Sequence, residues 1–351
     1  MSSELVFGAC PAPLRDDEAV TMGHGSGGRL SAELVERLLV PAFDNPALAA
    51  LDDQAVLPLP AAGRLALTTD SYVVSPIVFP GGDIGELAVN GTINDLAAGG
   101  AGPLALTFAL VLEEGLPMAD LRRVVESAAR AAARAGVPIV TGDTKVVGRG
   151  SGDGVFVNTT GVGVVPPHLT LGSAYVRPGD AVLVSGTVGD HGVAILATRE
   201  GLALEGDVRS DTAALHGLSA ALLEACPEVH AMRDPTRGGL AAALVEIASR
   251  RGLGVEIEEA AVPIDPAVRG ACELFGLDPM MIANEGKMVV FVPEARAGAA
   301  LEALRAHPLG RRAARIGRVT DAPAGRVSVR TAVGGARALE LPLTEPLPRI
   351  C

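Results

Sequence analysis

Strand-like and helix-like segments alternate along the whole chain of 351 residues, and this alternation constrains the fold more than any other feature. Runs rich in Val, Leu and Ile predict strands, whereas apolar residues spaced three or four apart predict helices. Such alternation predicts packed layers of helix and sheet, which is an α/β (α+β) fold. Hydrophobic residues make up 48% of the chain but aromatic residues only 3%, so the core must be aliphatic.

The predicted elements divide the chain into two halves and a short tail. In the first half we expect strands at 65–74, 104–112, 137–147 and 154–165, and helices at 84–98 and 119–135. In the second half we expect strands at 181–185, 255–257, 287–292, 314–319 and 326–330, and helices at 193–200, 212–225, 238–250 and 295–306. Pro166 and Pro167 interrupt the pattern between the halves. We therefore expect an N-terminal α/β domain over 1–167, a C-terminal α/β domain over 168–340 and a tail over 341–351.

Charge and composition argue against several functional classes. The net charge is −12 and no block of Lys or Arg occurs, which disfavours a nucleic-acid partner or an anionic membrane surface. The apolar run at 99–112 is too short and too interrupted by Gly and Pro to cross a bilayer, and the N-terminus lacks the order of a signal peptide. The four cysteines show no metal-ligand spacing. We expect a cytoplasmic protein with reduced thiols.

Aspartates flanked by small residues recur at predicted strand ends and turns. They are Asp52, Asp53, Asp70, Asp95, Asp143 and Asp234. Carboxylates at the ends of several strands can converge on one hard cation, and Mg²⁺ with phosphate is a common use of such a cluster. Each aspartate alone is explained as well by a helix cap or a turn. Their number favours metal–phosphate binding.

A glycine-rich loop, GHGSGG at 23–28, precedes a predicted helix that begins at Leu30. It contains the spacing GxGxxG, but residues 15–20 make a poor strand, so a dinucleotide-binding unit is disfavoured. Backbone N–H groups in such a loop can cover phosphates. The loop residues that we expect to do this are Gly25, Ser26, Gly27 and Gly28.

Two further residues could take part in the chemistry. Lys145 follows Asp143 at a strand end, where its ammonium could neutralise phosphoryl charge. Glu285 lies just before an apolar strand and could be a general base if water is partly excluded from it. The alternatives are an ordinary surface lysine and a turn glutamate. His191, which opens a predicted helix, is interpreted as a capping or supporting residue.

The chain ends in cysteine. Pro342, Pro346 and Pro348 disfavour a helix in the tail, and eleven residues from Leu341 could span at most about 35 Å. We expect the Cys351 thiol to be exposed and mobile, and able to visit more than one active site. The alternative is a frayed end that happens to stop at cysteine.

Together the motifs GHGSGG, LDDQAV, TTDSYVVSP, NGTINDLAAGGA, TGDTKVV, GDHG, RDPTRGGL and NEGK, with the ending PRIC, resemble the HypE family of hydrogenase maturation proteins. That family lies within the superfamily of aminoimidazole ribonucleotide synthetase and selenophosphate synthetase. The resemblance covers nearly the whole chain. The aspartate motifs alone indicate only the ATP-using superfamily, whereas the PRIC ending indicates the family.

The resemblance implies an ATP-dependent carbamoyl dehydratase with a two-domain PurM-like fold. The N-terminal sheet domain would dimerise, and ATP would lie between the domains. The partner carbamoyltransferase HypF would place a carbamoyl group on Cys351, which ATP hydrolysis would dehydrate to a thiocyanate. The cyanide would then pass to iron on the HypC–HypD complex, for assembly of a [NiFe]-hydrogenase.

The resemblance also implies roles for the matched residues. Those assigned to Mg–ATP are Asp52, Asp53, Asp70, Asn94, Asp95, Asp143, Thr144 and Asp234, and the Mg²⁺ ligands among them are Asp53, Asp70, Asp95 and Asp143. Glu285 would be the leading base and Lys145 would assist it. Cys351 would be the modified residue, with its thiol pKa raised by the terminal carboxylate and lowered by Arg349.

Two alternatives remain open from the sequence. A selenophosphate synthetase would carry cysteine or selenocysteine in the glycine-rich loop, where His24 and Ser26 stand here. A carrier or scaffold would hand on a group made elsewhere without hydrolysing ATP, and the aspartate motifs argue against it.

Overall fold

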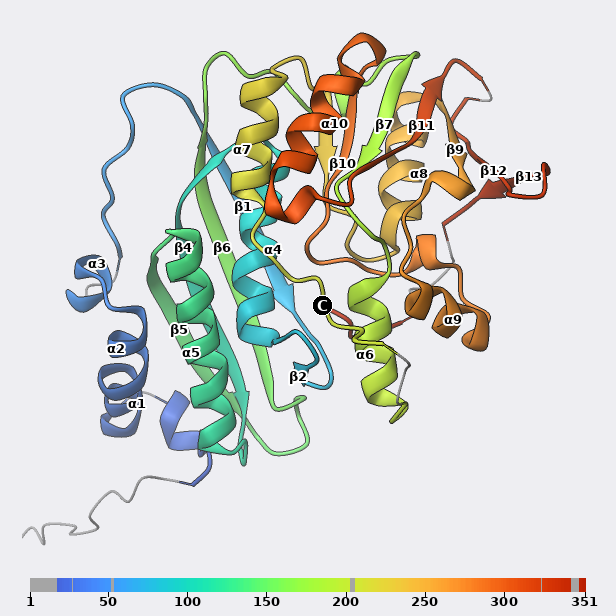
Figure 1. The fold of residues 1–351 in the computed structure, drawn as a ribbon. Helices are drawn as coiled ribbons and strands as arrows, with labels where there is room; N and C mark the ends of the chain where they lie inside the picture. Colours follow the sequence, from blue (N-terminus) through green and yellow to red (C-terminus); the bar gives the residue numbers. More distant parts are fainter. Residues whose placement is uncertain (1–17, 27, 52–53, 203–205, 323, 342–346) are drawn as a thin grey trace, which may run out of the picture.

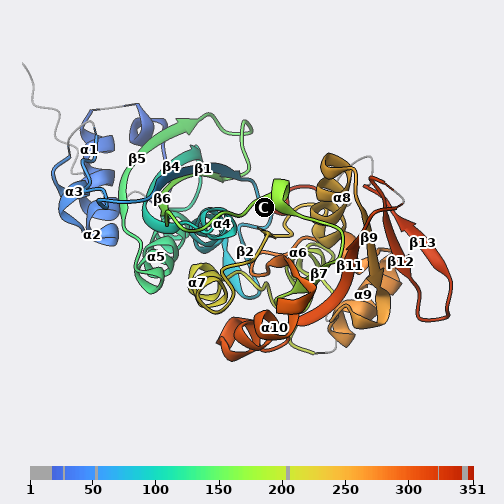
Figure 2. The same cartoon turned by 90° about the horizontal axis from the view of Figure 1, so that it is seen from above.

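The computed structural model describes residues 18–26, 28–51, 54–202, 206–322, 324–341 and 347–351. Two sheet-containing domains lie side by side, and the C-terminus lies between them (Figures 1 and 2). The first sheet ends at Val165 and the second begins at Asp180. The predicted boundary near residue 168 falls in this connection.

The N-terminal domain contains a four-stranded sheet with the order β1-β6-β4-β5. Its strands are β1 (Arg64–Tyr72), β4 (Gly102–Glu113), β5 (Ile139–Val147) and β6 (Val155–Val165). β6 pairs antiparallel with both β1 and β4, and β4 pairs parallel with β5. β1 and β5 are therefore the two outer strands of this sheet.

Helices α4 (Ile84–Ala98) and α5 (Met118–Ala135) cover one face of this sheet (Figure 1). α5 is amphipathic and buries the face predicted for it, including Leu121 and Val124. α4 is buried almost all round, because the sheet, α5 and the C-terminal domain enclose it. Asp83 starts α4 by accepting hydrogen bonds from the N–H groups of Gly85 and Glu86.

The other face of the sheet exposes apolar side chains. Leu65 and Leu67 on β1 are 57% and 65% exposed, and Val111 on β4 is 37% exposed. Alternate residues of β1 face opposite sides of the sheet, so Thr68 and Asp70 lie on the side of α4.

The C-terminal domain contains a seven-stranded sheet with the order β13-β12-β9-β11-β7-β10-β8. Its strands are β7 (Asp180–Val184), β8 (Ala231–Arg233), β9 (Gly254–Glu258), β10 (Val289–Pro293), β11 (Ala314–Thr320), β12 (Val327–Arg330) and β13 (Ala336–Leu339). Its helices are α6 (Asp190–Arg199), α7 (His216–Ala225), α8 (Gly239–Arg251), α9 (Pro266–Phe275) and α10 (Ala297–Ala306). The predicted face of α8, with Leu240, Leu244 and Ile247, is buried.

Shorter elements complete the structure. Near the N-terminus they are η1 (Met22–Gly25), α1 (Arg29–Leu34), η2 (Val35–Leu39), α2 (Val40–Phe43) and α3 (Pro46–Ala49), followed by β2 (Val78–Phe79) and β3 (Gly82–Asp83). In the second half they are η3 (Ser173–Tyr175), η4 (Glu259–Ala261), η5 (Pro279–Met281), η6 (Glu294–Arg296) and η7 (Pro308–Gly310). The sequence did not predict β8, α9 or β13. β8 and β13 are only three and four residues long, and so carry little periodicity.

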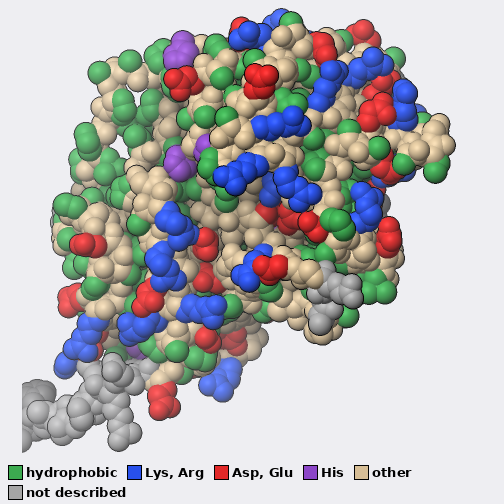
Figure 3. Space-filling model, in the orientation of Figure 1, with side chains coloured by type: hydrophobic (Ala, Val, Ile, Leu, Met, Phe, Trp, Pro, Cys, Tyr) green, Lys and Arg blue, Asp and Glu red, His purple; other side chains and the backbone are tan. Residues whose placement is uncertain are grey.

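The described residues include no helix that is long and apolar enough to cross a membrane. On the face drawn in Figure 3, basic side chains lie interspersed with acidic ones.

A glycine controls the contact between α4 and α5, and this gives a test of the packing. A Cβ atom at Gly85 would lie 2.1 Å from the carbonyl oxygen of Val124. We expect Gly85→Ala to force the helices apart and to lower the free energy of unfolding by about 1–3 kcal/mol. Chemical denaturation measures the change.

Gly270→Ala is the matched control, because Gly270 lies inside α9 with open space where its Cβ would be. We expect it to raise stability by about 0.5–1 kcal/mol through helix propensity. Equal effects of the two substitutions would contradict this account of the α4–α5 contact.

Candidate active site

The end of the tail is docked between the two domains. Leu347 and Ile350 are 7% and 1% exposed, and both pack in a core cluster that includes residues of both domains. The N–H of Ser75, beyond β1, donates to the carbonyl of Arg349 over 3.2 Å. Cys351 is itself only partly exposed. The structure thus corrects the expectation of an exposed thiol, because two apolar side chains near the chain end are buried.

The Cys351 thiol lies beside the Glu285 carboxyl, and each group shifts the pKa of the other. Glu285 is 3% exposed, and its Oε1 has no hydrogen-bond partner among the described residues. Burial, followed by the charges of Asp211 and Asp234, raises the pKa of Glu285 well above its usual range. Burial, followed by the Glu285 charge, does the same to the pKa of the Cys351 thiol.

The predicted rise in the Cys351 pKa is therefore confirmed in direction, but its causes differ. Arg237, and not Arg349, opposes the rise. Arg349 instead forms an ion pair with Asp153 in the N-terminal domain.

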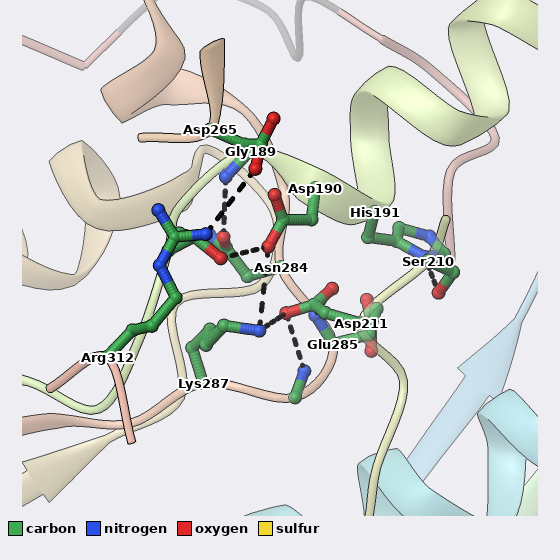
Figure 4. Close-up of polar contacts among 12 residues, drawn as sticks. Gly189, Asp190, His191, Ser210, Asp211, Asp265, Asn284, Glu285, Lys287 and Arg312 are labelled. Carbon is green, nitrogen blue, oxygen red and sulfur yellow. Dashed lines mark hydrogen bonds and ion pairs between the residues drawn. The ribbon is translucent and has the colours of Figure 1, made fainter. Parts of the chain in front are cut away.

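Asp211 fixes the backbone around Glu285. Its carboxylate accepts hydrogen bonds from the N–H groups of Glu285 and Gly286, each over 3.1 Å, and from Nζ of Lys287 over 2.8 Å (Figure 4). Burial raises the pKa of Asp211 and Lys287 lowers it, with a net downward shift. The carboxylate thus stays charged and holds the loop before β10. The sequence analysis missed Asp211, because no repeated motif surrounds it.

Asn94, which was expected beside Mg–ATP, forms hydrogen bonds to the C-terminal domain in this structure. Its amide nitrogen donates to the carbonyls of Ala213 and Glu285, and its amide oxygen accepts from the N–H of Leu215. Both amide hydrogens are thus used within the protein. Asn94 ties α4 to the C-terminal domain and holds the main chain of Glu285.

Asp70, Asp95 and Asp234 form an acidic cluster beside Glu285. Asp95 accepts a hydrogen bond of 2.7 Å from the hydroxyl of Thr68. Burial is the largest cause of the raised pKa of Asp95, and Asp70 adds to it. Burial, followed by the charge of Asp95, raises the pKa of Asp234 to about 7. Burial is thus the main cause of both shifts, and the neighbouring carboxyl charges add to it.

Asp143, Thr144 and Lys145 lie elsewhere, on β5. Since β6 and β4 separate β5 from β1, strand spacing places them about 14 Å from the strand of Asp70. Asp143 and Lys145 are exposed and form an ion pair with each other, which lowers the pKa of Asp143. One chain therefore does not bring the predicted residues into a single site. Within the described part of the chain, no three His, Cys, Asp or Glu side chains are placed to hold a metal ion.

The glycine-rich loop lies against β5. A Cβ atom at Gly25 would lie 2.2 Å from the backbone nitrogen of Val146, so the loop approaches the strand closely. A cavity of about 270 Å³ opens there, lined by His24, Gly25, Asp143, Thr144 and Lys145 together with apolar residues of the N-terminal helices. Ser26 and Gly28 follow His24 and Gly25 in the same loop but do not line this cavity. Gly27, Asp52 and Asp53, which were predicted as site residues, lie outside the described residues.

Tyr72 is a further residue that the sequence analysis did not single out. It is 1% exposed, and its hydroxyl has no hydrogen-bond partner of good geometry among the described residues, although Thr92 lies near it. A Cβ atom at Gly91 would lie 2.2 Å from this hydroxyl, so glycine leaves room for the ring. Burial, followed by the charges of Asp70 and Glu285, raises its pKa well above its usual range.

Two family models match this chain. Residues 51–165 match the N-terminal domain of AIR synthase related proteins, and residues 177–330 match the C-terminal domain of the same proteins.

Relatives and solved structures resemble the chain over nearly its full length. It is 56% identical over 332 residues to the carbamoyl dehydratase HypE of Cupriavidus necator, covering 95% of each chain. It is 50% identical over 338 residues to that of Escherichia coli, covering 95% of this chain and 99% of the relative. A crystal structure of HypE in complex with ATP superposes with a TM-score of 0.91 at 50% identity, covering 94% of this chain and 99% of that one. The chain therefore belongs to the HypE family of AIR synthase related proteins.

Proposed function

We propose that this protein uses ATP to dehydrate a carbamoyl group carried on its own Cys351, leaving a thiocyanate. The observation that carries the proposal is the docking of the Cys351 thiol against the buried Glu285 carboxyl. The relatives named carbamoyl dehydratase HypE support it.

The reaction needs activation because the oxygen of a carboxamide is a poor leaving group. Transfer of the γ-phosphoryl group of ATP to that oxygen converts it to phosphate, which can leave. The two N–H protons are lost as the C≡N bond forms, and the products are the S-cyanate, ADP and phosphate. Glu285 is placed to take a proton, since it lies beside the sulfur that carries the group. Burial raises the pKa of Glu285, so the carboxyl must first lose its own proton, and the carboxylate then takes up a proton readily.

The acidic cluster fits a magnesium ion that arrives with ATP. Mg²⁺ is usually bound by one or two carboxylates together with phosphate oxygens and water. Asp70, Asp95 and Asp234 offer carboxylates whose mutual repulsion a divalent cation would relieve. When bound, the ion would spread the charge of the transferred phosphoryl group.

The second part of the proposal is a dimer in which each site uses residues of both subunits. Lys145 and Glu285 lie apart in one chain, yet the open face of the N-terminal sheet carries exposed Leu65 and Leu67. A two-fold axis parallel to the strands would bury this face against its copy. It would also set β5 of one subunit opposite β1 of the other, so that the partner subunit's Lys145 approaches the site.

The partners follow from the same chemistry. A carbamoyl donor must load Cys351, and a solved HypE–HypF complex, which superposes with a TM-score of 0.77 at 45% identity, supports the carbamoyltransferase HypF as that donor. We propose that the cyanide then passes to iron on a HypC–HypD complex. We also propose that the protein acts in the cytoplasm, and the free thiols of the described cysteines agree with this.

Intact-protein mass spectrometry tests the reaction. Incubation with HypF, carbamoyl phosphate and ATP should place one carbamoyl group on Cys351. Because the same ATP also allows dehydration, the reaction is stopped early and the carbamoylated protein is separated from HypF and nucleotide. It is then given either fresh Mg–ATP or a non-hydrolysable analogue, and we expect loss of the mass of one water only with hydrolysable ATP. An adduct that never loses water would favour a carrier without its own ATPase.

Glu285→Gln should leave loading intact and slow the loss of water by about 10²–10⁴-fold, as expected for removal of a general base. Because Glu285 has a raised pKa, the amide resembles its protonated form and should not disturb folding. Glu302→Gln, on the exposed side of α10, is the matched control and should behave as the parent does. Dehydration at the parental rate in Glu285→Gln would remove Glu285 from the mechanism.

Complementation tests the shared site. Lys145→Ala and Glu285→Gln homodimers should each be inactive. Co-expression of the two variants with different tags should restore about a quarter of parental activity, since half of a random mixture is heterodimer with one intact site. If Lys145 acts within its own subunit, co-expression restores nothing.

A further inference from the structure

Hydrogen bonds to its backbone help to hold the docked tail. Three successive carbonyls, those of Pro348, Arg349 and Ile350, accept hydrogen bonds from other parts of the protein. The side chains of Leu347 and Ile350 are buried, and that of Arg349 is paired with Asp153. The donors on the C-terminal domain are two residues at opposite ends of α6, His191 and Arg199.

Arg199 binds three carbonyl oxygens, one beyond β1 and two in the tail. Its Nε donates to Ser75, its Nη1 donates to Pro348 over 2.7 Å, and its Nη2 donates to Arg349. No ion pair with a carboxylate is recorded for it among the described residues, and the charge that acts on it is that of Arg349. A guanidinium has five N–H donors in a fixed plane, so it can hold several carbonyls at once. Its hydrogen bonds therefore recognise the course of the main chain.

His191 holds the next carbonyl. It is fully buried, and its Nε2 lies 2.8 Å from the carbonyl oxygen of Ile350. Since that oxygen can only accept, Nε2 carries the hydrogen, and Nδ1 accepts from the Ser210 hydroxyl at 2.7 Å. The sequence suggested a capping or supporting role for His191, and this contact gives it a definite partner.

Arg349 turns the tail at this point. Its φ angle is 58°, in the left-handed region that residues other than glycine rarely adopt. Such a conformation persists only where the surroundings hold it. Here the Arg349 carbonyl receives two donors, from Ser75 and Arg199, and its side chain is paired with Asp153. The turn brings the last residue to Glu285.

We propose that Arg199 and His191 are positioning residues that recognise the main chain of residues 348–350 and seat the Cys351 thiol against Glu285. The inference rests on the proposed function, because the seat serves dehydration and not loading. Arg199 is half-buried and at the end of its helix, so water can replace the tail carbonyls when the tail leaves. The seat is therefore reversible, as a carrier that must also visit a partner requires.

The experiment compares Arg199→Ala with Arg251→Ala, an exposed arginine at the last position of α8. The first measurement is the rate at which iodoacetamide alkylates Cys351 in the unmodified protein, followed by peptide mapping. We expect Arg199→Ala to raise this rate about ten- to a hundredfold, as the loss of hydrogen bonds to a charged group predicts. Arg251→Ala should leave it unchanged. Arg199→Lys should restore it only in part, since an ammonium cannot hold the same three carbonyls.

The second measurement uses protein already carbamoylated on Cys351. Arg199→Ala should accept the carbamoyl group at the parental rate and then lose water about ten- to a hundredfold more slowly. Parental rates of both alkylation and water loss in Arg199→Ala would overturn the proposal. Faster alkylation, together with a parent that never loses water, would support the seat and overturn the proposed function instead. A thermal unfolding curve like that of the parent excludes a general loss of folding.

Discussion

The arrangement between the two domains depends on keeping the Glu285 carboxyl out of water. A buried carboxyl without a full set of partners is costly, so the surrounding structure must fix it strongly. Asp211 holds the N–H groups of Glu285 and its neighbour, while Asn94 on α4 holds the carbonyl. Each domain thus supplies one of the restraints, and the position of one carboxyl requires the two domains to be docked.

The sequence predicted much of this, because long periodic segments and repeated motifs are strong signals. The predicted helix over 84–98 coincides with α4, and Glu285, Cys351, Asp70, Asp95 and Asp234 meet as a cluster. The prediction of an exposed thiol was wrong. The neighbouring Ile350 is buried among segments distant in sequence, and such packing cannot be read from the tail alone. The contact between Asn94 and the main chain of Glu285 was not predicted. An amide beside an aspartate in a motif gives no sign of whether it faces a ligand or the backbone of another domain.

The separation of Lys145 from the acidic cluster has a similar origin. Motifs indicate that residues belong to one site, but they do not indicate whether one subunit or two subunits supply those residues. β1 and β5 are at opposite edges of one sheet. The sequence shows that both are strands, but it does not show how far apart they lie in the sheet. Sheet order is a non-local property, and it decides here whether a site is complete in one subunit.

Recognition of the tail through carbonyls has a consequence for how the chain end can change. Arg199 and His191 bind the backbone carbonyls of residues 348–350. The number of residues between these carbonyls and the thiol therefore sets where the sulfur lies. Adding a single residue between Ile350 and Cys351 would shift the sulfur by about 3.3 Å, the rise of an extended residue. Substitutions at Pro348 that keep the backbone course would leave the thiol in register. The end of this chain is therefore constrained in its length as well as in its buried side chains.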